Sequence, residues 1–329
     1  MNEKLKPLFS FVLRFGLSFA LLWLTFFIQK TSPQDVWNTL RSADPSYIVM
    51  AGCIFLILNL ILLFRWFIYV RALELSVPFS VVTRYFLIGL AGNLVLPTAI
   101  GGDVIKILGL CQYSPQKPKV VASVLLDRLS GFAGIVVVAI LAVIFNFHLI
   151  KNVTLLIGIV LLTAGSFVVG FILFNESVFS FCCQVFNRMP KIKQKLMDLH
   201  HDIALLKNRQ YALYQAVGIS ALAQVIAAVF FFLVAKGLHQ NISLMSFLVI
   251  TPLVGVASSI PSIGGLGARE GALTGLLGII CGIGKEAGKA IGFSIGIMNF
   301  FFMVIVGLIG AVVYFSTKDG KEPRTVLNT

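Results

Sequence analysis

The sequence predicts an all-α polytopic membrane protein with two inverted repeats, containing about six spanning helices and two broken, re-entrant helical hairpins. Hydrophobic residues make up 58% of the 329 residues and charged residues only 12%, whereas soluble domains carry about 25% charged residues. Apolar runs long enough to cross a bilayer recur along the chain. Two further apolar segments, about 80–112 and 243–282, are interrupted by proline and glycine at corresponding places in the two halves.

The predicted spans are the uninterrupted apolar runs, each close to the roughly 20 residues that a bilayer-crossing helix needs. They cover residues 8–29 and about 46–68, 120–147, 153–174, 212–235 and 288–315. The first run is too long for a signal peptide and lacks an A-x-A-like cleavage site, so we expect a retained first helix. The arm at about 80–96 is nearly long enough to span by itself, so a count of eight spans is the alternative.

The placement of lysine and arginine predicts the orientation. Basic residues concentrate in the N-terminus, 65–84, 106–119, 175–211 and the C-terminal tail, whereas the other connections are short and nearly balanced. The positive-inside rule makes the basic segments and both termini cytoplasmic, in a multi-pass protein of the cytoplasmic (inner) membrane. The first broken segment then has two cytoplasmic flanks and the second has two external flanks. Each must enter and leave by one face, from opposite sides of the membrane.

The chain divides near residue 150 into two halves of the same plan, each with two spans, a hairpin and a third span. Residues 1–150 form the first repeat, with its hairpin at about 80–112. Residues 151–329 form the inverted repeat, with its hairpin at about 243–282 and a cytoplasmic loop at 175–211. Apolar residues at helical spacing lie beside basic residues in this loop. The pattern suits a helix on the anionic inner leaflet, or equally a solvated helix packed on the protein.

Composition and motifs argue against several other classes. The excess of 26 Lys+Arg over 13 Asp+Glu follows from cytoplasmic loops, and no soluble basic domain exists to bind nucleic acid. The five cysteines show no C-x-x-C spacing, and the four histidines lack H-x-x-x-H spacing, so we expect no metal and no cofactor. An Asp103/Asp127 dyad leaves an embedded hydrolase open, although Ile100 departs from the G-x-G-D signature of intramembrane proteases. We otherwise expect no catalytic residues.

Each broken segment carries a proline, a glycine pair and a cation five positions after the first glycine. The pattern comprises Pro97, Gly101, Gly102 and Lys106 in the first segment, and Pro261, Gly264, Gly265 and Arg269 in the second. Backbone groups freed by such breaks are tolerated at depth only where they line a cavity. A half-helix starting at Gly102 or Gly265 would point its positive dipole end at that cavity. The pattern therefore predicts a site for a lipid headgroup phosphate, with Asn93 available to bond the freed backbone.

Four more charges lie within apolar segments, where charge is costly and usually functional: Asp103, Asp127, Arg128 and Glu270. We expect these residues to gate or couple transport, and Asp103 and Glu270 could take up a proton. The alternative is that the intramembrane charges pair among themselves and hold the hairpins in place, as for Asp103 and Lys106 at i,i+3. A small polar stripe on the same helix as Asp127 is fit for close packing and comprises Ser123, Asp127, Gly131 and Gly134.

Three motifs resemble the flippase-like integral membrane family that is named for the transmembrane region of lysylphosphatidylglycerol synthase. They are N-x-x-x-P-x-x-x-G-G-D from Asn93 to Asp103, D-R at Asp127-Arg128, and P-x-x-G-G-L-G-x-R-E from Pro261 to Glu270. The resemblance covers essentially the whole chain and implies a protein that moves a lipid or lipid-linked headgroup between leaflets. Bifunctional members also carry an aminoacyl-transfer domain, and the position of Thr329 leads us to expect a stand-alone member. Lys106 stands where the family pattern leads us to expect arginine.

The leading functional interpretation is therefore a lipid translocase rather than an enzyme. Its substrate could be an anionic or aminoacylated phospholipid, or a polyprenyl-linked sugar. The alternative is a non-transporting membrane partner that presents a lipid to a separate glycosyl- or aminoacyl-transferase. A face of small residues could pack within the protein or between subunits of a homo-oligomer, and it comprises Gly271, Gly275, Gly278 and Gly282.

Overall fold

The regular elements of the protein are α-helices throughout the described part of the chain, which confirms the predicted all-α membrane fold. The computed structural model describes residues 33–95, 101–145, 157–160, 210–259, 265–282 and 285–318, with scattered residues between 163 and 180. The helices are α2 (Pro33–Arg41), α3 (Pro45–Ala72), α4 (Phe79–Val95), α5 (Gly101–Leu110), α6 (Lys117–Phe145), α10 (Gln210–Gly237), α11 (Leu244–Ala257), α12 (Ala268–Cys281) and α13 (Lys285–Lys318).

Four helices, α3, α6, α10 and α13, are long and apolar enough to cross a membrane. The shortest of them has 28 residues, which at 1.5 Å per residue reaches about 42 Å against a hydrocarbon core of about 30 Å. They confirm the four predicted spans at about 46–68, 120–147, 212–235 and 288–315. The predicted span 8–29 lies outside the described residues, as do most of the span 153–174 and most of the loop 175–211.

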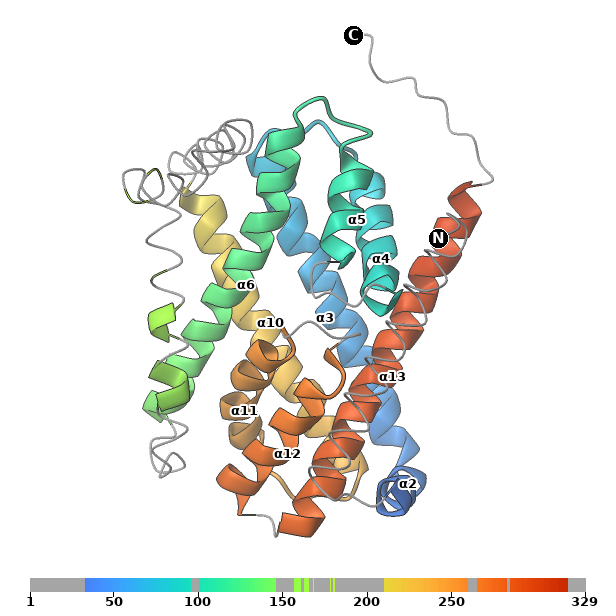
Figure 1. Ribbon diagram of the computed structural model, residues 1–329, viewed down its shortest axis with the longest axis vertical. Coiled ribbons are helices and arrows are strands. Elements are labelled where there is room, and N and C mark those ends of the chain that lie inside the picture. Colours follow the sequence, from blue (N-terminus) through green and yellow to red (C-terminus); the bar gives the residue numbers. More distant parts are fainter. Residues whose placement is uncertain are drawn as a thin grey trace, which may run out of the picture.

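The remaining apolar helices form two hairpins that begin and end at opposite ends of the molecule. The outer ends of α4 and α5 both lie at the upper end in Figure 1, and those of α11 and α12 lie at the lower end. These helices have 17, 10, 14 and 14 residues, or about 15–26 Å, which is too short to cross the hydrocarbon core. The arrangement agrees with two oppositely directed re-entrant hairpins rather than eight spans. The predicted boundary near residue 150 lies outside the described residues.

Helix ends at the lower end of the molecule are tied together by capping groups. Asp44 caps α3, because its carboxylate accepts a hydrogen bond from the backbone N–H of Ser46 at 2.8 Å. The backbone N–H of Asp44 donates to the carbonyl oxygen of Gly237 at the end of α10, also at 2.8 Å. Ser243 caps α11 by accepting from the N–H of Ser246 at 3.1 Å. The bond between Asp44 and Gly237 fixes where α3 starts relative to the end of α10, and the Ser243 cap fixes where α11 starts.

The apolar core of the described residues has two large clusters, one around each hairpin, and a smaller third cluster where α6 packs against α11. The lower cluster joins α3, α10, α11, α12 and α13, and its centre is a trio of rings from Phe55, Phe230 and Phe302 with centroids 5.2 to 5.9 Å apart. The upper cluster joins α3, α4, α5 and α6 around the fully buried Trp66 and Tyr69. The broken ends of the two hairpins face each other between these clusters (Figure 1).

Candidate functional site

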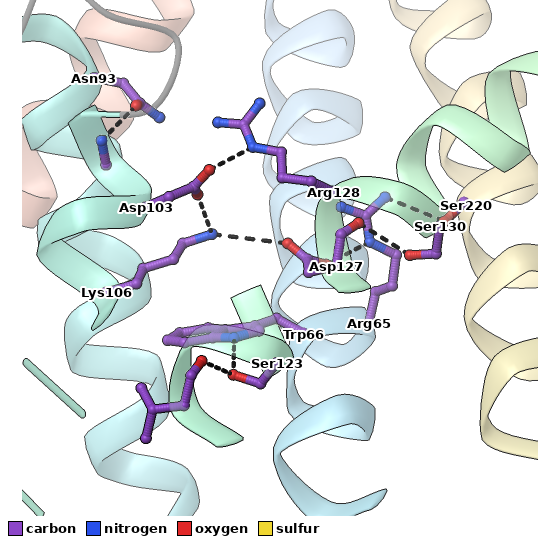
Figure 2. Close-up of polar contacts among 12 residues, drawn as sticks. Arg65, Trp66, Asn93, Asp103, Lys106, Ser123, Asp127, Arg128, Ser130 and Ser220 are labelled. Atoms are coloured by element: carbon purple, nitrogen blue, oxygen red, sulfur yellow. Dashed lines mark hydrogen bonds and ion pairs between the residues drawn. The ribbon is translucent and has the colours of Figure 1, made fainter. Parts of the chain in front are cut away.

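Five charged side chains from α3, α5 and α6 form one network, which we call the α5–α6 charge cluster (Figure 2). Arg65 Nε donates to Asp127 Oδ1 at 2.7 Å. Lys106 Nζ lies 3.7 Å from Asp103 Oδ1 and 3.9 Å from Asp127 Oδ2, and Arg128 Nε donates to Asp103 Oδ2. Three cations thus share two carboxylates, which leaves the cluster with an excess of one positive charge.

The ammonium group of Lys106 is enclosed on its remaining sides by aromatic rings. Its Nζ lies 5.0 Å from the ring centroid of Trp66 and 4.9 Å from that of Phe86. Both distances fall within the roughly 6 Å at which a ring face attracts a cation. Lys106 is only 8% exposed. Its charge is therefore satisfied by two carboxylates and two ring faces rather than by solvent.

Arg65 links the α5–α6 charge cluster to α10. Its Nη1 donates to Ser220 Oγ at 3.2 Å, and the small residues of α6 make room for this contact. A Cβ built on Gly131 would lie 3.1 Å from Arg65 Nη1, and one built on Gly134 would collide with Ser220. The predicted small polar stripe thus packs closely, against α3 and α10.

The α4–α5 hairpin is closed at its broken end by Asn93. The side-chain oxygen Asn93 Oδ1 accepts a hydrogen bond from the backbone N–H of Gly102 at 2.9 Å (Figure 2). A Cβ on Gly102 would collide with the carbonyl oxygen of Gly89, so the two helices approach at backbone distance. Asn93 thus bonds the backbone at the break, as the sequence suggests. A helix start leaves four backbone N–H groups without an acceptor in the helix, and Asn93 supplies an acceptor for one of them.

A second charged group lies at the start of α12. Arg269 Nε and Nη2 donate to Glu270 Oε1 at 3.2 and 2.9 Å, and Arg269 Nη1 donates to Asn299 Oδ1 on α13. Glu270 is fully buried and its Oε2 accepts from the backbone N–H of Gly267 at 2.6 Å. Gly296 on α13 makes room for this carboxylate, because a Cβ there would lie 2.6 Å from Glu270 Cγ.

The start of α12 differs from the prediction. The sequence favours a half-helix beginning at Gly265, whereas α12 begins at Ala268. Gly265 and Gly267 have φ angles of 78° and 87°, a region open to glycine, so the chain turns here instead of continuing as helix. Glu270, at the third position of α12, accepts from the backbone N–H of Gly267 at the N-cap, as the Glu of a capping box does, although glycine has no side chain to form the other half.

A cavity of about 380 Å³ lies between the broken ends of the two hairpins. Its charged lining residues are Arg128, whose side chain is 38% exposed, and Arg269, whose side chain is 4% exposed. Its neutral polar lining residues are Asn59, Asn93, Gln224, Thr251, Ser258, Ser259 and Asn299. No carboxylate belongs to the lining among the residues that the structure describes. The volume is within the range of about 300–1,000 Å³ typical of small-molecule sites.

The structure separates the predicted site residues into those that line the cavity and those behind its wall. Asn93, Arg128, Gly265 and Arg269 line it. Gly101, Gly102, Asp103, Lys106, Asp127 and Glu270 are buried but are not lining residues. Pro97, Pro261 and Gly264 lie outside the described residues. The cations that face the cavity are thus Arg128 and Arg269. The sequence pattern had instead predicted Lys106 and Arg269, which hold corresponding positions in the two broken segments.

The sequence interpretation missed several polar residues of the cavity wall. Asn59, Gln224 and Asn299 lie in the middle of α3, α10 and α13, and Thr251 precedes a proline inside α11. A detectable signal existed, because amide side chains inside otherwise apolar spans usually face protein rather than lipid. Arg65, at the start of the basic segment 65–84 that the positive-inside rule makes cytoplasmic, also proves to be the main partner of Asp127.

Fold and site together define a polytopic α-helical membrane protein with two oppositely directed broken hairpins around a charged central cavity. The comparisons agree with that class. The family described as "Lysylphosphatidylglycerol synthase TM region" matches residues 11–307, and the chain belongs to this family. A UPF0104 membrane protein of Methanothermobacter thermautotrophicus is 22% identical over 313 residues, which covers 88% of this chain and 91% of that relative.

Proposed function

We propose that this protein moves a phospholipid or lipid-linked headgroup between the leaflets of the cytoplasmic membrane. The observation that carries the proposal is a cavity between the broken ends of two hairpins that approach from opposite ends, with two arginines and seven neutral polar residues among its otherwise apolar lining. Discontinuous helices meeting near the middle of inverted repeats are where secondary transporters bind their substrates. A headgroup that crosses the bilayer needs such a polar site, because hydrocarbon offers it no hydrogen-bond partners.

In this proposal the two arginines of the cavity wall bind the headgroup. Arg128 comes from the side of the first hairpin and Arg269 from the second. Asp103, Asp127 and Glu270 hold these cations from behind, either directly or through Lys106 and Arg65, and do not line the cavity. We assign Lys106 a positioning role, because its charge is already satisfied by Asp103 and Asp127. The same carboxylates are the candidates for gating or coupling.

The proposal includes a non-enzymatic role, an inner-membrane location and cytoplasmic termini. An aspartic dyad would need two carboxyl groups that share a proton. Here Asp103 and Asp127 each bind an arginine, and the ammonium group of Lys106 lies within 4 Å of both. The basic helix ends at the upper side of Figure 1 support the orientation, since the ends of α3 and α6 that carry Arg71 and Lys117 both lie there.

The test is transport of headgroup-labelled phospholipids by the purified protein in proteoliposomes. Wild type is compared with Arg128→Ala, Arg269→Ala and Lys106→Ala, and with Gln112→Ala at an exposed turn as control. We expect transport by wild type and the control, and a loss of at least about tenfold for both arginine variants, since a charge-assisted hydrogen bond is worth about 1.5–3 kcal/mol. Absence of transport by folded wild type with every lipid class would contradict the proposal and favour a lipid-presenting partner of a transferase.

A further inference from the structure

The cavity wall carries positive charge. Among the described lining residues the charged groups are both cationic, and the remaining polar groups are neutral amides and hydroxyls. Glu270 neutralises Arg269 through two hydrogen bonds. The α5–α6 charge cluster, in contrast, has three cations and two carboxylates. The unbalanced positive charge of the site thus belongs to the cluster that contains Arg128.

Arg128 is the cation of that cluster that an occupant of the cavity can reach. Its side chain is 38% exposed, whereas those of Arg65 and Lys106 are each 10% exposed. Its Nε is engaged with Asp103, which orients the guanidinium plane from one edge. A guanidinium held in this way suits a phosphate oxygen better than a flexible ammonium does. One negative charge bound in the cavity beside Arg128 would balance the five described side chains of the cluster.

The neutral wall of the cavity carries buried acceptors that have no donor. Gln224 Oε1 and Thr251 Oγ1 are buried without a hydrogen-bond partner, and both residues line the cavity. Thr251 is only 4% exposed. An amide oxygen can only accept hydrogen bonds, so it requires a donor such as a hydroxyl group. Asn59 and Asn299 add further amides to the same wall.

From these observations we infer that the cavity selects a lipid phosphodiester with one negative charge and a neutral, hydroxylated headgroup, such as glycerol or a sugar. This inference rests on the proposed function and names its substrate class. The phosphate binds Arg128, and the headgroup hydroxyls donate to Gln224 and Thr251. An aminoacylated headgroup brings an ammonium into a site that already has surplus positive charge. Repulsion between like charges in a site of low dielectric disfavours such a headgroup.

The test is direct lipid binding, measured separately from transport. Purified full-length protein in detergent is titrated with phosphatidylglycerol, a polyprenyl-phosphoryl sugar, lysyl-phosphatidylglycerol and phosphatidylcholine, and bound lipid is counted by native mass spectrometry. We expect at least tenfold tighter binding of phosphatidylglycerol or the phosphoryl sugar than of the other two. Whichever of these two binds tighter identifies the headgroup as glycerol or sugar. Equal or tighter binding of the lysyl lipid or phosphatidylcholine would overturn the inference.

A charge substitution in the neutral wall sharpens the test. Gln224→Glu places a carboxylate in the cavity wall that also contains Arg128. It should weaken phosphatidylglycerol binding at least tenfold, and phosphatidylcholine binding less, because the choline cation offsets the added negative charge. The matched control, Gln112→Glu, adds the same charge at an exposed turn after α5 and should bind as wild type does. Unchanged phosphatidylglycerol binding by a folded Gln224→Glu protein would also overturn the inference.

The outcomes separate the inference from the proposed function. Selective binding of phosphatidylglycerol by a protein that transports no lipid would support the inference and contradict transport. Transport of lysyl-phosphatidylglycerol and phosphatidylcholine at the rate of phosphatidylglycerol would support transport and overturn the inference.

Discussion

At the scale of single residues, the buried charges divide into those that hold the structure and those that face the cavity. Asp127 lies between Arg65 and Lys106, and Asp103 lies between Lys106 and Arg128. A buried pair gains little over an apolar one, but breaking it leaves an uncompensated charge and is costly. Removing a carboxylate should therefore destabilise the protein more than removing a cation that is in surplus.

Substitutions of Asp127 and Arg65 test this asymmetry. Asp127→Asn leaves three cations around one carboxylate, so we expect a loss of about 3–5 kcal/mol in the free energy of unfolding. Arg65→Gln leaves two cations and two carboxylates and should cost less. The double variant should cost less than the sum of the two, because the residues are in direct contact. Denaturant titration in detergent measures all three, and additive costs would contradict the network.

At the scale of elements, the hairpins depend on close backbone approach at their broken ends. Gly102 in α5 lies against the carbonyl oxygen of Gly89 in α4, and Asn93 of α4 caps α5. Gly296 in α13 leaves space for Glu270, which caps α12. Each half-helix therefore begins with a backbone N–H satisfied by protein rather than by substrate. In the proposed function, Arg128 and Arg269 of the cavity wall are the charged partners of the headgroup.

Two glycine substitutions test the role of this close approach. In Gly102→Ala the new methyl group meets a backbone carbonyl that cannot rotate away, so α5 must shift from Asn93. We expect a loss of about 1–3 kcal/mol in stability, the usual cost of overpacking. The matched control is Gly218→Ala in α10, where an added Cβ meets nothing within 4 Å and should cause no loss. Thermal unfolding in detergent distinguishes the two, and equal midpoints would count against this packing.

At the scale of the whole molecule, the cavity arises because the two hairpins are short. Neither α5 nor α12 is long enough to cross the hydrocarbon core, so the first residues of both helices lie near the middle of the molecule. The spanning helices α3 and α10 pass beside both apolar clusters and contribute Asn59 and Gln224 to the cavity between them. A central cavity that carries arginines and amides between long apolar helices is the arrangement that supports a role in lipid movement.

The sequence was sufficient for the helical class, four of the spans and the positions of both broken segments. Apolar run length and lysine and arginine placement report these features directly. The partners of the charges could not be predicted in the same way, because they depend on helix rotation and on contacts between distant segments. Arg65 meets Asp127 across 62 positions. For the same reason, the sequence pattern predicted Lys106 and Arg269 as the two cations of the site, whereas Arg128 faces the cavity together with Arg269.

The most direct test of the central claim is to map where a bound headgroup lies. A phospholipid with a photoreactive group on its headgroup is added to the protein, irradiated, and the cross-linked residues are identified by mass spectrometry. We expect cross-links at cavity residues such as Gln224, Ser258 and Met303, and loss of these cross-links when unlabelled lipid competes. Cross-links confined to outward-facing residues such as Leu222 and Leu308, which are 50% and 59% exposed, would contradict the account.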